Sequence, residues 1–234
     1  VLITGGAGHV GIAAAHALIE LGANVVLLDI SEASLIDASK TLPEGRSGIV
    51  VCDLAKDSSI KEALAKVEEL TAGKLTCIIN NAAFVGTSNL KGWSVPFENQ
   101  SLDTFKSCLD VNLSAPFYLV QQLMPLLENA EGDKSVINIS SIYGVVGPQM
   151  DLYEGTGMGN PAAYAASKAG LIQLTKWMAS VLAPHIRVNS LVLGGIYRGQ
   201  DQAFLNKYNA RVPLNRMATE EDVKGAIAYL ATSL

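Results

Sequence analysis

The regular alternation of two kinds of segment along the whole chain is the feature that most limits how it can fold. Short apolar segments rich in Val and Ile, typical of strands covered on both faces, alternate with longer segments of helical periodicity. This alternation predicts a parallel, doubly wound α/β sheet with right-handed crossovers. The expected strands are residues 1–4, 24–29, 47–52, 76–80, 135–140 and 187–193. The expected helices are residues 10–22, 32–42, 56–72, 101–130, 162–184 and 219–232, the fourth interrupted by Pro116 and Pro125.

The composition indicates a globular protein and excludes several function classes. The 234 residues are 49% hydrophobic and 17% charged, and they show no linker or repeat, so we expect a single domain over 1–234. A formal net charge of −5 offers no basic face for nucleic acid or anionic lipid. No apolar stretch approaches the roughly 18 residues of a membrane span, so we expect a cytoplasmic protein with no membrane partner. Cys52 and Cys77 lie in apolar runs, as buried thiols do, and no metal motif is present.

Three long segments fit neither pattern and follow the expected strands. They are residues 84–100, 143–161 and 195–216, which contain Gly and Pro or are polar. In open α/β sheets, ligands bind beyond the carboxyl ends of the strands, and long loops there are commonly functional. We therefore expect the site at this edge.

A glycine-rich segment, Thr4-Gly5-Gly6-Ala7-Gly8-His9-Val10-Gly11, directly follows the first strand and opens the first helix. Glycines at such a turn let backbone N–H groups approach a pyrophosphate at the helix N-terminus. The context makes the motif more specific, because Asp29 ends the second strand about 20 residues further on. Asp29 is placed to hydrogen-bond an adenosine ribose, and its charge would repel a 2′-phosphate. NAD is therefore favoured over NADP, although Asp29 could instead be a helix N-cap or a solvated turn residue.

The segment Tyr164-Ala165-Ala166-Ser167-Lys168 carries a candidate acid/base pair. The i, i+4 spacing places the phenol and the ammonium group on one helix face. A nearby cation lowers the pKa of a tyrosine, which lets the phenol exchange a proton with a substrate oxygen near neutral pH. The alternative is an ordinary surface pair.

These motifs, taken in order, resemble those of the classical short-chain dehydrogenase/reductase family over essentially the whole chain. The further matching segments are Asp53-Leu54, Asn80-Asn81-Ala82-Ala83, Asp110-Val111-Asn112-Leu113, Ser140-Ser141 and Arg187-Val188-Asn189. The resemblance implies a Rossmann sheet with the strand order 3-2-1-4-5-6. The family usually continues with a seventh strand, which we do not expect within residues 1–234.

The resemblance also implies a role for each matching residue. Tyr164 is the acid/base, Lys168 lowers its pKa and holds the nicotinamide ribose, and Ser141 hydrogen-bonds the reacting oxygen. Asn112 anchors a proton-relay water or satisfies a break in a helix, and Ser140 could replace Ser141. The expected catalytic residues are Asn112, Ser141, Tyr164 and Lys168. The expected cofactor-binding residues are Gly5, Gly8, His9, Val10, Asp29, Asp53, Leu54, Asn81, Ala82, Ala83, Tyr164, Lys168, Gly194 and Ile196.

Some positions depart from the family pattern. His9 stands where classical members usually have a glycine, and it could contact pyrophosphate or have no role. The spacing of Gly8 and Gly11 is closer to that of extended members that act on nucleotide sugars. Leu193-Gly194-Gly195 replaces the usual Pro-Gly, so Ile196 is expected to contact the nicotinamide through its backbone.

The resulting hypothesis is an NAD-dependent oxidoreductase that interconverts a secondary alcohol and a ketone on a polar, sugar-like small molecule. The alternatives are an extended-type nucleotide-sugar epimerase or dehydratase, and a non-catalytic NAD-binding sensor. The segment from Ser141 to Tyr164 resembles a subgroup associated with bacterial sugar modification, such as nonulosonate biosynthesis and flagellin glycosylation.

An insertion over residues 147–161 is expected to form a wall of the substrate pocket, since both its ends are tied to catalytic groups. Its hydrogen-bonding residues are Asp151, Tyr153, Glu154, Thr156 and Asn160. Glu154 in particular is expected to contact a hydroxylated substrate. A surface excursion or an oligomer contact is the alternative. The helices 101–130 and 162–184 resemble those that pair in the family's homodimers and homotetramers, so self-association is expected.

Overall fold

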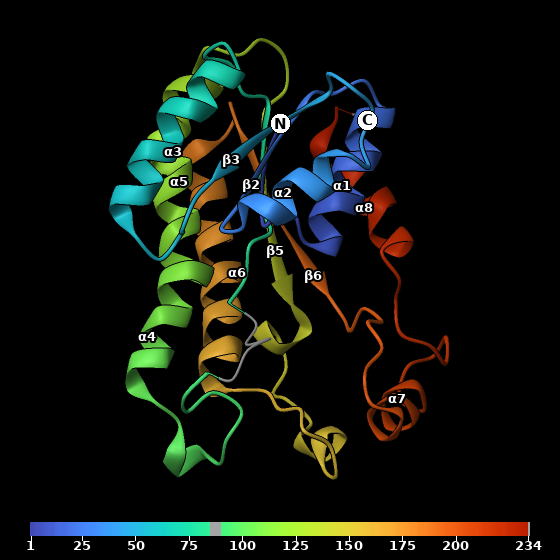
Figure 1. Ribbon diagram of the computed structural model, residues 1–234. Helices are drawn as coiled ribbons and strands as arrows, with labels where there is room; N and C mark the ends of the chain where they lie inside the picture. Colours follow the sequence, from blue (N-terminus) through green and yellow to red (C-terminus); the bar gives the residue numbers. More distant parts are fainter. Residues whose placement is uncertain (85–89, 234) are drawn as a thin grey trace.

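The computed structural model describes residues 1–84 and 90–233 (Figure 1). Its six parallel strands form one sheet in the order β3-β2-β1-β4-β5-β6, which confirms the predicted fold and strand order. The strands are β1 (Leu2–Thr4), β2 (Val25–Asp29), β3 (Ser47–Val51), β4 (Cys77–Asn80), β5 (Ser135–Ser141) and β6 (Arg187–Leu193). The central strands are almost entirely buried, as expected for a parallel sheet covered on both faces.

Helices form a layer on each face of the sheet (Figure 1). One layer holds α1 (His9–Glu20), α2 (Glu32–Ser39) and α8 (Glu221–Ala231), and the other holds α3 (Asp57–Leu70), α5 (Ala115–Glu128) and α6 (Ala162–Leu182). Alternate residues of one strand face different layers. Leu27 packs with the α1 and α2 side chains, whereas Val26 and Leu28 pack with those of α3 and α5.

The expected helix over residues 101–130 is divided. It consists of α4 (Leu102–Leu109), a π-helical turn η2 (Asp110–Ser114) and α5. In the π-turn, the Ala115 N–H donates to the Asp110 carbonyl, one residue further back than in an α-helix. Pro116 has no N–H with which to close an α-helical bond to the Asn112 carbonyl, which accounts for a break at this point.

The prediction that residues 195–216 lack regular structure is wrong. They contain the helix α7 (Gln202–Asn209), which begins at Asp201, whose carboxylate accepts a hydrogen bond from the Ala203 N–H at 2.7 Å. The helix is held by the buried Phe204, whose ring stacks on Tyr208 with centroids 5.6 Å apart. Short 3₁₀ turns also lie in the other long segments: η1 (Phe97–Asn99), η3 (Ile142–Gly144) and η4 (Met150–Tyr153).

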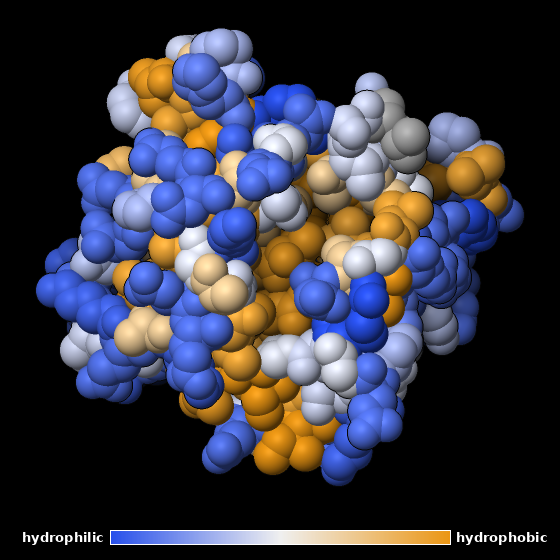
Figure 2. All heavy atoms as spheres, turned by 90° about the horizontal axis from the view of Figure 1, so that it is seen from above, coloured by the Kyte–Doolittle hydropathy of each residue, from blue (hydrophilic) through white to orange (hydrophobic). Residues whose placement is uncertain are grey.

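Residues 90–100, 143–161 and 195–216 gather at the edge where the strands end, below the sheet in Figure 1. Figure 2 views the opposite edge, where apolar side chains run from the middle to the lower rim and hydrophilic ones lie on either side. The cysteines are buried and free, and burial raises the pKa of the Cys77 thiol to about 12. Across 1–84 and 90–233, no helix combines the length and apolar character needed to cross a membrane.

Candidate active site

The turn between β1 and α1 leaves no space for side chains at its glycines. Gly5 has a φ of +61°, and a Cβ there would lie 2.8 Å from the Cα of Ala82. A Cβ on Gly11 would overlap the Gly5 carbonyl oxygen. Gly8 caps α1 without a side-chain hydrogen bond, and the first turn holds no acidic residue. The N–H groups at the start of α1 are therefore available to an anion, and this cradle fits a dinucleotide diphosphate.

The segment after β4 holds this turn in place. The Thr4 hydroxyl accepts hydrogen bonds from the backbone N–H groups of Asn81 and Ala82, each at 3.0 Å. The Asn81 amide donates to the carbonyls of Thr4 and Gly5, also at 3.0 Å. The Asn81 side-chain nitrogen and the N–H groups of Asn81 and Ala82 are thus occupied by the turn, so the backbone of Ala83 is the part of this segment that these bonds leave to a ligand. Sequence reasoning assigned no role to Thr4, although its position directly before the glycines is a usable signal.

Asp29 lies beside the glycine turn at the end of β2. Its carboxylate accepts hydrogen bonds from the Ala7 N–H at 3.1 Å and from the Ile30 N–H at 2.8 Å. The N-cap of α2 is Ser31, whose hydroxyl accepts from the Ser34 N–H. The alternative of Asp29 as a helix N-cap is therefore wrong, and its charge is fixed at the adenosine end of the expected site.

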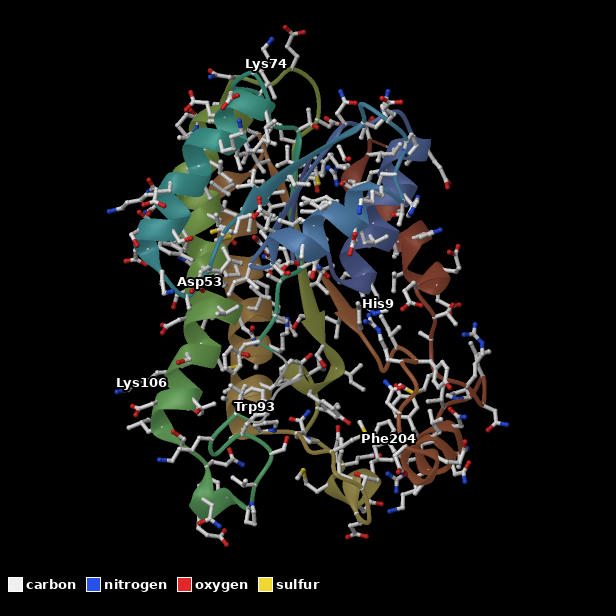
Figure 3. The ribbon with its side chains drawn as sticks, in the orientation of Figure 1. His9, Asp53, Lys74, Trp93, Lys106 and Phe204 are labelled. Atoms are coloured by element: carbon white, nitrogen blue, oxygen red, sulfur yellow. The ribbon has the colours of Figure 1, made fainter. Side chains whose placement is uncertain are left out.

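Asp53 and Leu54 follow β3 at the same edge. The Asp53 carboxylate lies 2.9 Å from the Lys56 ammonium group, and this hydrogen bond lowers the pKa of Asp53. Leu54 is 9% exposed and packs in the core, so only a small part of it is available to an adenine. Figure 3 shows Asp53 and His9 near the starts of helices in opposite layers.

His9 is the first residue of α1, and its side chain is largely exposed. Its Nδ1 lies 3.5 Å from a carboxylate oxygen of Glu220, and the Arg198 Nε lies 3.5 Å from the same oxygen. Val10, next to it, packs partly buried against the core. The imidazole thus contacts the residue preceding α8, not the expected catalytic groups.

Ser141, Tyr164 and Lys168 are brought together by β5 and α6. Ser141 ends β5, is 7% exposed, and lies near enough to Tyr164 for its hydroxyl to lower the pKa of the phenol. Lys168 is 2% exposed and its ammonium group lies 5.8 Å from the centre of the Tyr164 ring. The adjacent Ser140 donates instead to the Lys168 backbone carbonyl at 2.9 Å. Of the two serines, only Ser141 is thus in contact with the phenol.

The ionisation of this pair differs from the sequence-based expectation. Burial raises the pKa of Tyr164, and the nearby Ser141 hydroxyl only partly opposes this rise. Burial lowers the pKa of Lys168 to about 8. The expected lowering of the Tyr164 pKa by Lys168 is therefore not seen. The reason is that the ammonium group donates to the Ile139 carbonyl at 2.8 Å and is itself poorly stabilised as a cation.

Asn112 lies fully buried in the π-turn between α4 and α5. Its side-chain oxygen accepts a hydrogen bond from the Phe84 N–H at 2.6 Å, and its amide donates to the Ser167 hydroxyl at 3.0 Å. The side chain therefore joins the segment after β4 to α6. Because Pro116 has no N–H, it cannot donate to the Asn112 backbone carbonyl, where we expect the water.

The segment after β6 passes close to α7. The Gly195 N–H donates to the Tyr208 hydroxyl at 2.6 Å, and a Cβ on Gly195 would lie 2.6 Å from the Met217 side chain. Gly194 is exposed beside it, and Ile196 forms a parallel bridge with Ala218. The chain thus needs a glycine at 195 to pass between Tyr208 and Met217 with Ile196 at the carboxyl edge.

The insertion 147–161 packs against α7. Leu152 is buried with Phe204, which Figure 3 labels on α7, and with Met217. The Lys207 ammonium group donates to the backbone carbonyls of Asp151 and Glu154 at 2.7 and 3.1 Å.

The polar residues of the insertion have different environments. The Asp151 carboxylate pairs with Arg211, and Glu154 is exposed. Thr156 donates to the Tyr153 carbonyl at 2.8 Å within the turn. Only Tyr153 has contacts that lead back to the catalytic groups, through a 2.9 Å hydrogen bond to Tyr143. The expected substrate contact of Glu154 is therefore less well supported than one of Tyr153.

A family model described as enoyl-(acyl carrier protein) reductase matches residues 5–234. The chain is 30% identical to a 3-oxoacyl-[acyl-carrier-protein] reductase of Thermotoga maritima, covering 99% of this chain and 89% of the relative. It is 29% identical to the post-translational flagellin modification protein A of Campylobacter coli, covering 98% and 90%.

Two solved structures are also similar. One is a short chain dehydrogenase of Leptospira borgpetersenii with bound NAD⁺, at 30% identity, a TM-score of 0.83 and coverage of 99% and 85%. The other is an NAD⁺-bound xylitol dehydrogenase, at 25% identity, a TM-score of 0.84 and coverage of 99% and 91%. The chain is thus an oxidoreductase by fold and site. It belongs to the classical short-chain dehydrogenase/reductase family.

Proposed function

We propose that this protein is an NAD-dependent oxidoreductase that interconverts a secondary alcohol and a ketone on a polar, sugar-like substrate. The observation that carries the proposal is the contact between Ser141 and Tyr164, with Lys168 buried beside them, at the same edge as the glycine turn. Because Ser141, Tyr164 and Lys168 are all present, the site gives no support to a non-catalytic sensor. None of the relatives named above is an epimerase or a dehydratase.

The chemistry follows from the two hydroxyl groups. The substrate oxygen lies between Ser141, which orients it, and Tyr164, which exchanges a proton with it. The bound nicotinamide supplies the hydride in reduction and accepts it in oxidation. Because burial raises its pKa, Tyr164 is a proton donor at neutral pH, which suits ketone reduction. Alcohol oxidation needs the ionised phenol, so its rate should increase as the pH rises.

The cofactor preference rests on Asp29. Its carboxylate is fixed by two backbone N–H groups, so it cannot turn away from a 2′-phosphate without losing them. The two solved relatives described above hold NAD⁺, which supports the same choice here.

The substrate class is inferred from the insertion and from the relatives. Tyr143 and Tyr153 offer hydroxyls and are linked by hydrogen bonds to the catalytic Ser141, which suits a hydroxylated molecule. One of the similar structures is that of a xylitol dehydrogenase, and one of the relatives is a flagellin modification protein. Both names point to polyhydroxylated or sugar-related chemistry in proteins similar to this one.

Cofactor binding and turnover test this proposal together. Protein fluorescence should report a dissociation constant for NAD about tenfold or more below that for NADP, and xylitol or L-fucose should reduce NAD. Asp29→Ser should narrow the difference between the cofactors mainly by weakening NAD, because it removes both the ribose contact and the repulsion.

Asp37→Ser is the matched control, since this exposed carboxylate on α2 is paired with Lys40. Equal affinities of the wild-type protein for NAD and NADP would contradict the cofactor assignment.

We also infer that the chain self-associates through α5 and α6. Phe117 on α5 and Trp177 and Val181 on α6 are 40%, 56% and 51% exposed, more than is usual for such large apolar side chains. Light scattering should give a mass of at least two chains, and Trp177→Lys should lower it. A wild-type protein that stays monomeric at micromolar concentration would contradict this inference.

A further inference from the structure

Two tyrosines next to the catalytic phenol are joined by a hydrogen bond. Tyr143 lies in η3, two residues after Ser141, and Tyr153 lies in η4, within the insertion. The Tyr153 hydroxyl donates to the Tyr143 hydroxyl at 2.9 Å, and both residues are partly buried. The insertion thus places the Tyr153 phenol in contact with Tyr143, which closely follows the catalytic Ser141.

This hydrogen bond determines whether the Tyr143 hydroxyl can still donate its own proton. A phenol carries one proton and also accepts hydrogen bonds. Since the Tyr143 oxygen accepts the Tyr153 proton, its own proton is left for another partner. Within residues 1–84 and 90–233, no hydrogen bond donated by the Tyr143 hydroxyl is present. The Asn160 Oδ1 is buried without a hydrogen-bond partner in that part of the chain.

The free proton of Tyr143 lies close to the reacting atoms. The Tyr143 N–H donates to the Ser141 hydroxyl at 3.2 Å, so Tyr143 is held directly beside the catalytic serine. Burial raises the pKa values of Tyr164 and Tyr153, and the neighbouring phenols contribute in the same direction. A substrate whose reacting oxygen touches Ser141 and Tyr164 therefore presents its next atoms to Tyr143.

The Tyr153 side chain is held in place by packing against α7. The Tyr153 ring lies 5.5 Å from that of Phe204 on α7, and its neighbour Leu152 is buried. A donor held by such packing loses little conformational freedom on binding, which makes its contribution to specificity larger.

We propose that the Tyr143 hydroxyl donates a hydrogen bond to an oxygen on the carbon next to the reacting carbon, with Tyr153 as the residue that positions it. This inference rests on the proposed function and makes it more specific. The substrate class becomes that of vicinal oxygenated alcohols, such as polyols and sugars, rather than isolated secondary alcohols.

Two small probes isolate the second oxygen. Rates of NAD reduction are compared for trans-1,2-cyclohexanediol and cyclohexanol, which differ by one hydroxyl. The wild-type protein should prefer the diol by about tenfold or more in kcat/KM, because the analogue leaves a buried donor unpaired. Tyr143→Phe should bring the two values to within about twofold.

Tyr153→Phe separates positioning from contact. It keeps the Tyr143 donor but frees its direction, so the preference for the diol should fall partway, mainly through a higher KM. Tyr229→Phe, on the exposed face of α8, is the matched control and should change neither value.

Three results would contradict either this inference or the proposed function. A diol preference that survives Tyr143→Phe would assign this residue to packing and overturn the inference alone. A wild-type protein that binds NAD but oxidises neither probe would also overturn it, while leaving the cofactor assignment intact. Failure to bind NAD would overturn the proposed function itself.

Discussion

Lys168 carries a charge in the least favourable environment of the site. It is 2% exposed, and its ammonium group donates to a neutral acceptor, the Ile139 carbonyl, at 2.8 Å. Burial lowers its pKa from 10.5 to about 8, which means that the folded protein resists the charged form. The residue is thus retained at a cost to stability, as is common for groups that serve a reaction.

Replacing Lys168 should therefore stabilise the fold at neutral pH. Lys168→Met removes a burial penalty of up to roughly 3 kcal/mol and loses one hydrogen bond of about 1 kcal/mol. Thermal unfolding should show a higher Tm for the variant at pH 7, together with lower turnover. Lys176→Met, on the exposed side of α6, should leave the Tm nearly unchanged.

The stability gained by Lys168→Met should depend on pH. Below about pH 8, Lys168 is charged in both the folded and the unfolded chain, and the penalty is complete. Between about pH 8 and 10.5, the folded protein loses the proton first, so the wild type gains stability that the variant does not. The advantage of Lys168→Met should shrink over this range, and an advantage independent of pH would disprove the assignment.

At the scale of elements, the π-turn between α4 and α5 connects three parts of the site. The π-turn η2 places the Asn112 side chain between the segment after β4 and α6, where it contacts Phe84 and Ser167. These buried contacts connect α6, which carries Tyr164, to the segment after β4.

Removing that amide should destabilise the protein. Asn112→Ala leaves the Phe84 N–H without its acceptor, which costs about 1–3 kcal/mol when the group stays buried. Denaturant unfolding should report a loss in this range, and turnover should fall as Tyr164 loses its support. Asn99→Ala, at an exposed position in η1, is the control. Unchanged stability of Asn112→Ala would show that water replaces the amide.

The sequence predicted the strands well and the divided helices less well. The strands are continuous apolar runs, such as Ile78-Ile79, whose burial on both faces leaves a clear signal. Prolines 116 and 125 indicated an interruption, but only the structure shows a π-turn before the first of them. The helix α7 escaped prediction because it is short and polar, and its one buried residue, Phe204, contacts an insertion far away in the sequence.

At the scale of the whole molecule, one edge of the sheet carries all the expected chemistry. The strand order places β1 and β4 side by side at the centre, so the segments that follow them meet through Thr4 and Asn81. The long segments after β4, β5 and β6 lie over the same edge (Figure 1). This convergence follows from the parallel topology and was predictable from the alternation of elements alone.

What could not be predicted at this scale is how the segments contact one another. The order of motifs located Ser141, Tyr164 and Lys168, but not the direction of the Lys168 ammonium group, which depends on a carbonyl of β5. Nor did the sequence indicate that the insertion packs on α7 through Leu152, since apolar residues in both segments are few. Long-range packing of this kind leaves no periodic signal.

The turnover of Tyr164→Phe tests the central claim most directly. The variant keeps the ring and removes only the transferable proton, so the dissociation constant for NAD should stay near that of the wild type. Its kcat on the best polyol or sugar substrate should fall by about 10²–10⁴-fold. Retention of near wild-type turnover by this variant would contradict proton transfer by Tyr164, and with it the mechanism proposed for this protein.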